Sequence, residues 1–460
     1  MIFERIISEG LSHFSYFLGS DKEAIVIDPR RDCQIYIDLA KKEKMKIKYI
    51  FETHRNEDYV IGSVELSHLT GAKILHGLGL DFKFGEKIED NQVFSFGKMK
   101  LRAIRTPGHT DESMSYALID DTLKKQIIMV FSGDALFAGD VGRTDLYGIK
   151  ESPRLAESLY ESIFNKILPL GDGVILCPAH GGGSICGGSI SDQEWSTLGL
   201  ERLNNPVLQK SKKEFIRFKV NEKLEHPPYF KKMEQMNLNG PPILDSIPNP
   251  PPLSAEKFKE IINDNVLILD VRKPSDFGGS YIKGSVNIWL NGLPAFGGWI
   301  LTYDRPIGLI LDSSQNLEIA VKFLVRLGFD DIRGYLCDGV EECGIESWYN
   351  DALPTEHGGL LTVQELKNWL DNNNDLFVLD VRTDKEWKKE HIENIHHIYV
   401  GNLKDHLSEI PDNKPIAVIC SVGNRGSIGA SILRHADKKN VFNVIGGMIA
   451  WKKAGYPVTK

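Results

Sequence analysis

The chain has 460 residues, and its 42% apolar and 26% charged residues are typical of folded domains rather than disordered chains. A formal net charge of −8 disfavours nucleic acid or an anionic membrane as a partner. At a typical size of about 150 residues each, we expect about three domains. The sequence shows neither a run of about 18 apolar residues nor a charged-then-apolar leader, so we expect a cytoplasmic protein without a membrane anchor.

The first domain is predicted over residues 1–245. It begins with short β-rich runs such as residues 23–28 and then alternates strands with helical segments such as residues 154–167. Residues 189–240 are charged and helical in character, and we expect them to cover a site. Six prolines between positions 241 and 252 predict a stiff, extended linker at the end of this domain.

Four segments of the first domain carry residues that bind metals. They are Thr53-His54-Arg55-Asn56-Glu57-Asp58-Tyr59, Pro107-Gly108-His109, Ser132-Gly133-Asp134 and Pro178-Ala179-His180. Their order and spacing resemble the metallo-β-lactamase superfamily, whose first segment reads THxHxDH. Here Asn56 and Tyr59 stand where that pattern has its second and third histidines. The resemblance implies an α/β fold, an αββα sandwich, for residues 1–245.

The two missing histidines change which metal and which reaction we expect. The complete family pattern holds two metals, so a two-zinc hydrolase is poorly supported here. His54, His109 and Asp134 remain, and two imidazoles with one carboxylate form the facial triad that favours mononuclear non-haem Fe(II), with room for O₂ and a substrate. This reduced ligand set resembles that of the persulfide dioxygenases of this superfamily, which bind iron. The resemblance implies one Fe(II) per chain, although zinc competes for such sites in vitro.

Further residues are expected around this metal. Asp58, Tyr59 and His180 would orient the ligands or relay protons. The segment Gly142-Arg143-Thr144-Asp145 resembles one that lines the site in persulfide dioxygenases and glyoxalase II relatives. That resemblance implies that Arg143 binds a carboxylate of a glutathione-like substrate, with a surface salt bridge as the alternative. Cys186, in a glycine-rich stretch after His180, is expected to accept sulfur, gate the site or serve structure alone.

Beyond the linker the chain repeats itself. Residues 266–272 return in residues 376–382, and each copy begins with a Ser- or Thr-led helix followed by an apolar strand. The shared LDVR sequence and the late segment at residues 446–451 resemble the rhodanese family. This resemblance implies two α/β rhodanese domains, at residues 254–352 and 360–460.

Of the two repeats, the second contains the residues that we expect to react. A buried strand at residues 417–419 runs into Cys420-Ser421-Val422-Gly423-Asn424-Arg425 and a helix from about Ser427. A loop of this kind aims backbone N–H groups and a helix N-terminus at one point, which stabilises a Cys420 thiolate or persulfide, and Arg425 adds positive charge. The spacing resembles rhodaneses that take up sulfane sulfur.

The first copy lacks this machinery. It has Asp312 in place of the cysteine and Leu317 in place of the arginine. We therefore expect an inert spacer or interface in preference to altered ion chemistry.

The remaining cysteines give no functional signal. The six cysteines form no CxxC pair, and in a large intracellular chain such residues are more often thiols than disulfides. We therefore expect Cys33, Cys177, Cys337 and Cys343 to be structural or incidental.

Together the resemblances imply an enzyme of sulfide detoxification. The iron site would oxidise a low-molecular-weight thiol persulfide, such as glutathione persulfide, to sulfite with O₂. Cys420 would then transfer sulfane sulfur to an acceptor such as sulfite or a thiol. Homo-oligomers are common among such fusions. The alternatives are a glyoxalase II-like thioester hydrolase and a non-catalytic scaffold for the rhodanese domain.

Overall fold

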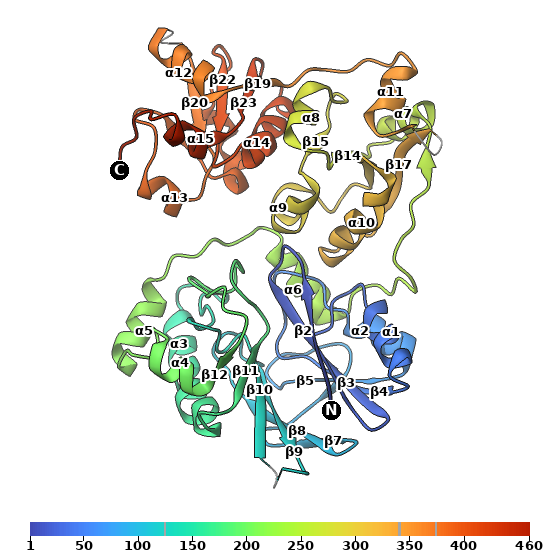
Figure 1. Cartoon of the computed structure of the whole chain (residues 1–460), viewed down its shortest axis with the longest axis vertical. Helices are drawn as coiled ribbons and strands as arrows, with labels where there is room; N and C mark the ends of the chain where they lie inside the picture. The colour runs from blue at the N-terminus through green and yellow to red at the C-terminus, as the bar shows by residue number, and fades with distance from the viewer. Residues whose placement is uncertain (124–125, 339–341, 373–374) are drawn as a thin grey trace. The chain divides into compact units, whose positions relative to one another are not determined.

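The computed structural model describes residues 1–123, 126–338, 342–372 and 375–460 (Figure 1). The chain divides into two compact units, Met1–Ile247 with Val325–Gly328, and Pro248–Leu324 with Phe329–Lys460. Both units mix helices with sheets, so the predicted α/β class is confirmed. Among the described residues, none of the helices combines the length and apolarity that a membrane span needs.

The first unit contains two six-stranded sheets. The first sheet has the order β1 (Ile2–Ser8), β2 (His13–Ser20), β3 (Glu23–Ile27), β4 (Lys46–Phe51), β5 (Lys73–His76), β6 (Glu86–Lys87). The second has the order β12 (Ser196–Thr197), β11 (Ile175–Pro178), β10 (Gln126–Gly133), β9 (Met114–Asp120), β8 (Met99–Arg105), β7 (Val93–Phe96). Strands β1 to β3 are antiparallel and β3 to β6 are parallel, whereas β7 to β10 form an antiparallel meander.

The two sheets face each other across a core of large apolar side chains. Tyr16 and Phe51 of the first sheet contribute to it, together with Tyr116 and Phe131 of the second, and each is at most 2% exposed. Because side chains alternate along a strand, the opposite faces also carry apolar residues, which helices must cover.

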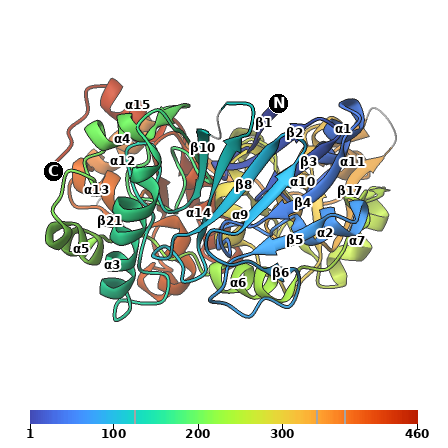
Figure 2. The same ribbon diagram turned by 90° about the horizontal axis from the view of Figure 1, so that it is seen from below.

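Helices cover both outer faces and complete the predicted αββα sandwich (Figure 2). On the first sheet lie α1 (Gln34–Lys42) and α2 (Ser63–Thr70). On the second lie α3 (Ser152–Ser162), η1 (Ile163–Ile167), η2 (Leu168–Leu170), α4 (Leu198–Asn204) and α5 (Lys212–Asn221). The segment predicted to be helical at 189–240 contains α4, α5 and α6 (Phe230–Asn239).

The second unit contains two parallel sheets of the same strand order. The first has the order β13 (Pro252–Leu253), β17 (Ile332–Asp338), β16 (Ile307–Ile310), β14 (Leu267–Asp270), β15 (Val286–Asn287), with β18 (Glu342–Cys343) antiparallel to β17. The second has the order β19 (Gly359–Leu361), β23 (Val441–Val444), β22 (Ile416–Ile419), β20 (Phe377–Asp380), β21 (His396–His397). The sequence repeat is therefore a repeat of one fold.

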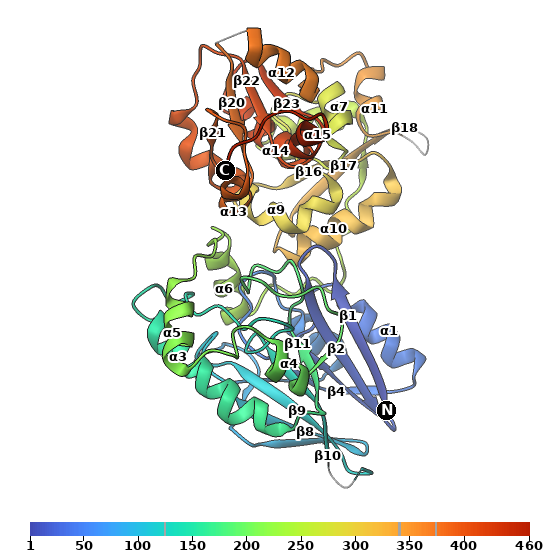
Figure 3. The ribbon, with the colours of Figure 1, turned by 60° about the vertical axis from the view of Figure 1, so that its left-hand side comes forward.

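Helices connect the parallel strands in both repeats. In the first these are α7 (Ala255–Asn263), α8 (Pro274–Gly279), η3 (Leu290–Gly292), α9 (Leu293–Ile300), η4 (Ser314–Asn316), α10 (Leu317–Arg326) and α11 (Ile345–Asn350). In the second they are α12 (Val363–Asn372), α13 (Asp384–Lys389), η5 (Val400–Glu409), α14 (Asn424–His435) and α15 (Gly447–Lys453). Figure 3 shows helices of this unit, such as α12 and α14, beside strands β20 and β22.

The LDVR sequence has a structural reason in both repeats. Arg272 Nη2 lies 2.6 Å from Asp270 Oδ2, and Arg382 Nη2 lies 2.6 Å from Asp380 Oδ2. All four side chains are buried. A buried carboxylate requires such a partner, so the aspartate and the arginine two residues later are retained together.

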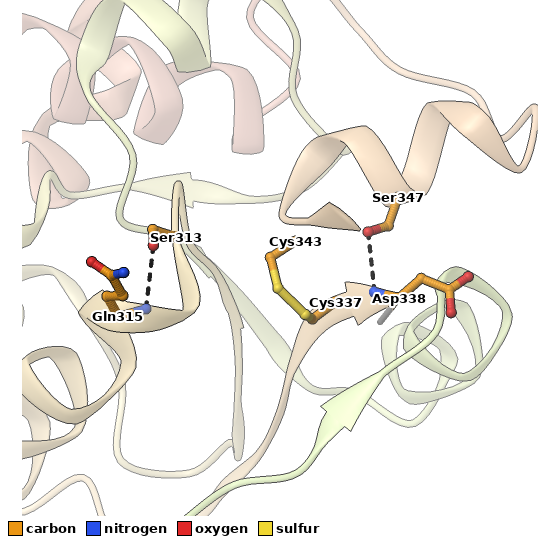
Figure 4. Close-up of a disulfide and its surroundings, with 6 residues drawn as sticks. All are labelled: Ser313, Gln315, Cys337, Asp338, Cys343 and Ser347. Carbon is orange, nitrogen blue, oxygen red and sulfur yellow. Dashed lines mark hydrogen bonds between the residues drawn. A yellow bond between two sulfur atoms is a disulfide. The ribbon is translucent and has the colours of Figure 1, made fainter. Parts of the chain in front are cut away.

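One expectation about the cysteines was wrong, because Cys337 and Cys343 are joined in a disulfide (Figure 4). The two residues stand opposite each other in the antiparallel pairing of β17 with β18, which brings their Cβ atoms close. A spacing of six residues without a CxxC pair gave no sign of this hairpin. Cys33, Cys177, Cys186 and Cys420 are free thiols, as expected.

This disulfide predicts a specific labelling pattern. In denaturant without reductant, we expect iodoacetamide to modify the four free cysteines, and after reduction all six. Intact-mass spectrometry counts the labels. The Cys343→Ser variant is the control, since it should give the same number of labels with and without reductant. Six labels on the unreduced wild-type chain would contradict the disulfide.

Candidate metal centre and sulfur-transfer loop

The three predicted metal ligands meet where strands of the first unit end. His54 follows β4, His109 lies between β8 and β9, and Asp134 follows β10 directly. His54 Nε2 lies 3.6 Å from Asp134 Oδ2, and His109 Nε2 lies 3.5 Å from the same oxygen. All three side chains are buried, and their ligand atoms lie within 4.8 Å of one another. The sequence segments are thus brought together as one cluster.

Hydrogen bonds to the far side of each imidazole set its orientation. Thr53 Oγ1 donates to Asp28 Oδ2 at 2.7 Å and therefore accepts from His54 Nδ1 at 2.9 Å. His109 Nδ1 donates to the carbonyl oxygen of Arg143 at 3.0 Å. With both Nδ1 atoms protonated, loss of the Nε2 proton leaves each ring with a lone pair that faces Asp134.

The atoms that face one another in this cluster fit a metal ion. Within the described residues, His54 Nε2, His109 Nε2 and Asp134 Oδ2 are buried and have no hydrogen-bond partner. Buried polar atoms normally have partners, so three such atoms facing one another fit the donor set of a cation. Two nitrogen donors and one carboxylate would hold such an ion, as the sequence predicts.

The local charges keep these groups ready to bind a cation. Burial lowers the pKa of His54 to about 4, so its ring is neutral at physiological pH. Burial alone would raise the pKa of Asp134, but His180 and His54 outweigh that effect and hold the pKa below its ordinary value. Protons therefore compete weakly with a metal at both ligands.

His180 connects Asp134 to Asp58. Its Nδ1 lies 2.8 Å from Asp134 Oδ1, and its Nε2 lies 3.0 Å from Asp58 Oδ2. Although burial lowers the pKa of His180, the two carboxylates raise it well above its ordinary value. Asp58 and His180 thus lie beside the ligands, in positions suited to orient Asp134.

Tyr59 makes no hydrogen bond to this cluster within the described residues, whereas Cys186 belongs to a second group of potential ligands beside it. The buried hydroxyl of Tyr59 has no hydrogen-bond partner among the described residues, and its ring lies 4.1 Å from the ring of His13. Cys186 lies with Asp58 and His180 in a second group of potential ligands. Burial, followed by the Asp58 and Asp134 carboxylates, raises the pKa of the Cys186 thiol well above its ordinary value, which disfavours the thiolate.

Arg143 is fully buried and bound within the protein. Its guanidinium makes a bidentate pair with Asp145, at 2.7 and 2.9 Å, and donates to the carbonyl oxygen of Glu225 at 3.0 Å. The alternative for this residue was a surface salt bridge; the structure contains a salt bridge, but its arginine is buried. Binding of a substrate carboxylate by Arg143 stays a prediction.

Sequence reasoning missed two acidic residues of the site. Asp28 supports His54 through Thr53, and Glu57 Oε2 lies 3.5 Å from His109 Nε2. Asp28 lies outside the four motif segments and gave no signal. Glu57 lies inside the first segment, at a position where the family pattern accepts any residue.

The loop at Cys420 has the predicted form. It follows β22, and the backbone N–H of Gly423 donates to Cys420 Sγ at 3.1 Å. Helix α14 begins at Asn424, three residues before the predicted start, because Gly423 takes a left-handed turn with φ of 107° directly before it. The cysteine sulfur thus lies at the N-terminus of a twelve-residue helix.

Arg425 reaches Glu386 rather than the cysteine. Its Nη1 and Nη2 atoms donate to the Glu386 carboxylate at 2.6 and 2.7 Å, and Nη2 also donates to Ser421 Oγ at 2.8 Å. No sequence motif pointed to Glu386, whose contact with Arg425 depends on α13 lying beside the loop. Arg425 therefore braces the loop, and its predicted catalytic role stays a prediction.

The corresponding loop of the first repeat has no free thiol among its described residues. Asp312 is exposed and accepts from Asn316 Nδ2 at 2.6 Å. A cavity of about 300 Å³ beside it is lined by Arg272, Asp312 and Cys343, and this cysteine is the disulfide-bonded one. The geometry agrees with a repeat that keeps its fold without the nucleophile.

Two family models match the chain. The metallo-beta-lactamase superfamily model matches residues 9–180, and the rhodanese-like domain model matches residues 254–350 and 362–454. The crystal structure of a metallo-beta-lactamase from Staphylococcus aureus subsp. aureus COL has a TM-score of 0.65 at 31% identity, and the match covers 73% of this chain and 98% of that one. Fold and site thus define a metallo-β-lactamase domain followed by two rhodanese-like domains.

Curated relatives narrow this class. The mitochondrial persulfide dioxygenase ETHE1 of Bos taurus is 33% identical over 226 residues, which are 46% of this chain and 78% of that protein. A hydroxyacylglutathione hydrolase of Dictyostelium discoideum is 28% identical over 174 residues, 36% of this chain and 62% of that protein. The chain belongs to the persulfide dioxygenase family, as its sequence motifs predicted, and carries two rhodanese-like domains in addition.

Proposed function

We propose that the first domain oxidises a low-molecular-weight thiol persulfide, such as glutathione persulfide, to sulfite at one Fe(II) held by His54, His109 and Asp134. The observation that carries this proposal is the cluster of three buried ligand atoms without hydrogen-bond partners, in a domain that is 33% identical over 226 residues to a persulfide dioxygenase. When bound, Fe(II) supplies a position for the terminal sulfur and the activation of O₂.

The protein's own groups have defined tasks in this reaction. Thr53 and the Arg143 carbonyl hold the two imidazoles, and His180 holds Asp134 in its ionised form. Burial of all three ligands excludes water from the cluster. The balanced reaction is RSSH + O₂ + H₂O → RSH + SO₃²⁻ + 2 H⁺, in which the terminal sulfur is oxidised and O₂ is reduced.

The second activity that we propose is sulfur transfer at Cys420. The thiolate would attack the terminal sulfur of a persulfide, release the thiol and become a cysteine persulfide. Sulfite would then attack that outer sulfur, giving thiosulfate and restoring the thiolate. The Gly423 N–H and the start of α14 support this step, since both stabilise negative charge on Cys420 sulfur. The sulfite from the iron site would serve as one acceptor.

A thioester hydrolase is the second candidate, supported by the 28% identity to a hydroxyacylglutathione hydrolase. That reaction relies on a metal-bound hydroxide, usually strengthened by a second metal. Asn56 and Tyr59 replace two imidazoles of the two-metal pattern, and the Tyr59 hydroxyl has no polar contact with the described ligands. These replacements favour the one-metal oxidation.

Oxygen uptake tests the proposal directly. Cys420→Ser protein, in which sulfur transfer cannot consume the sulfite, should after purification without oxygen and loading with Fe(II) consume one O₂ for each glutathione persulfide added and release one sulfite, measured with an oxygen electrode and by sulfite derivatisation. S-lactoylglutathione is the control substrate and should not be hydrolysed. Hydrolysis of the thioester without oxygen uptake would replace the proposal with the hydrolase. If iron-replete protein shows neither activity, the remaining alternative is a non-catalytic scaffold for the rhodanese domain.

A further inference from the structure

We propose that the Cys337–Cys343 disulfide makes the first rhodanese-like repeat a site of thiol–disulfide exchange, where a small thiol without negative charge attacks the sulfur of Cys343. The site lies in the repeat that lacks the counterpart of Cys420, and it uses neither the metal centre nor Cys420 itself. It therefore goes beyond the proposed function and can be tested independently of it.

The segment that carries Cys343 lies against the strand end at which the second repeat carries its nucleophile. A Cβ at Gly344 would lie 2.2 Å from the carbonyl oxygen of Leu311, the residue directly after β16. A Cβ at Gly447 would lie 2.2 Å from the carbonyl oxygen of Cys420, the residue directly after β22. The two glycines, both at positive φ, thus hold the same place in the two repeats.

The helix that follows each glycine supports this match. Nε1 of Trp348 on α11 and Nε1 of Trp451 on α15 each donate, at 2.9 Å, to the carbonyl oxygen of the proline six residues later. Cys343, which directly precedes Gly344, therefore takes the place that Gly446 has in the second repeat. The first repeat has no cysteine directly after its strand, but it carries a sulfur atom on the segment that lies against that strand end.

A cavity leads to one of the two sulfur atoms. Of the two cysteines, only Cys343 lines the cavity of about 300 Å³, and Figure 4 shows the disulfide together with Ser313, which lines it as well. Cys337 is 4% exposed, whereas Cys343 is half-buried. A cavity needs roughly 10–15 Å³ to hold one water molecule, so this one has room for a thiol of several non-hydrogen atoms. An entering thiol therefore reaches Cys343, and the buried Cys337 is the leaving group.

The charges around the cavity select among thiols. Its lining contains the exposed carboxylates of Asp276, Asp312 and Glu346. Arg272 is the cation among the described lining residues, and it is buried and paired with Asp270 at 2.6 Å. The excess negative charge repels an anionic thiol and attracts one that carries an ammonium group. Because the three carboxylates are exposed, we expect this preference to weaken with salt.

The exchange proceeds in two balanced steps. In the first, RSH + Cys337–S–S–Cys343 → RS–S–Cys343 + HS–Cys337, the thiol sulfur bonds to Cys343, the disulfide bond breaks and the Cys337 sulfur takes up the proton. In the second, RSH + RS–S–Cys343 → RSSR + HS–Cys343, so two thiols are oxidised and the protein disulfide is reduced. The disulfide spans only six positions, and short loops gain least from a cross-link, so the fold should survive its opening.

The test exposes native, full-length protein under nitrogen to cysteamine, 2-mercaptoethanol or 3-mercaptopropionate and traps released thiols with excess iodoacetamide. Peptide mass spectrometry should find the added thiol joined to Cys343 and the alkyl group on Cys337. A free cysteine cannot form such an adduct with a thiol when no oxidant is present. Each rate is divided by the rate of the same thiol with hydroxyethyl disulfide, which is uncharged. Cysteamine should then react about tenfold faster than 3-mercaptopropionate at low salt, and the ratio should approach one at about 1 M salt.

Two variants test the role of the cavity charges. Glu346→Gln removes one carboxylate of the lining and should lower the ratio of the two rates by about two- to threefold. Glu260→Gln is the matched control, since it removes an exposed carboxylate of α7 that does not line the cavity, and it should leave the ratio unchanged.

The outcomes separate the parts of the inference. An adduct on Cys337 in place of Cys343, or no adduct on the native protein, would overturn the site. A ratio near one at low salt, or equal effects of the two variants, would overturn the proposed class of thiol. None of these measurements needs bound iron or Cys420, so the proposed function can fail while this inference holds, and the reverse.

Discussion

The His54→Ala variant is expected to lose its metal and, with it, persulfide-dependent oxygen uptake, while sulfur transfer by Cys420 persists. One of only two imidazole donors disappears, and the cavity left behind cannot supply another. We expect metal affinity to fall by about 100-fold or more and oxygen uptake to fall to background, since loss of residues that merely support a ligand already costs about 10- to 100-fold. Metal analysis and an oxygen electrode measure the two effects.

A surface histidine provides the control for this variant. His68→Ala removes an exposed imidazole on α2 and should leave metal content and oxygen uptake unchanged. Thiosulfate formation should be the same in both variants, because Cys420 belongs to the other compact unit. A His54→Ala protein that keeps its metal and its oxygen uptake would remove His54 from the ligand set.

The Cys420→Ser variant should show the opposite behaviour. A serine hydroxyl has almost the shape of the thiol but cannot carry a sulfane sulfur, so thiosulfate formation should fall by roughly 10³-fold or more. Oxygen uptake by the iron-loaded variant should stay at the wild-type rate. Both rates are measured on the same preparation, with glutathione persulfide as donor and sulfite as acceptor.

The matching position in the first repeat provides the comparison. Asp312→Asn changes an exposed carboxylate at the same strand end and should affect neither rate. If Cys420→Ser protein still formed thiosulfate, the transfer would have to use another thiol, and Cys186, the free cysteine beside His180, would be examined next.

The sequence predicted those parts of the molecule that depend on short segments. His54, His109 and Asp134 each lie just after a strand, within a recognisable motif, so their meeting at the strand ends of the two facing sheets follows from the fold. The Cys420 loop was predictable for the same reason, since the strand, the loop and the start of the helix are continuous in sequence.

Partners brought in by packing were not predictable in this way. Glu386 meets Arg425 across 39 residues, and Asp28 meets Thr53 across 25, through contacts between separate elements. The Cys337–Cys343 pair depends on the register of a hairpin that the expected strands did not include. In each case the residue type was visible in the sequence, but the neighbour was decided by tertiary structure.

The side chain and the main-chain carbonyl of Arg143 make different contacts. Its guanidinium is the predicted contact for a substrate carboxylate, whereas its main-chain oxygen orients His109. The path of this segment is tightly restricted, because a Cβ at Gly142 would lie 2.0 Å from the carbonyl oxygen of Asp134. A movement of the Arg143 backbone would therefore also move the carbonyl oxygen that orients His109. Replacing the Arg143 side chain therefore tests the predicted substrate contact by itself only if the Arg143 carbonyl oxygen keeps its hydrogen bond with His109 Nδ1.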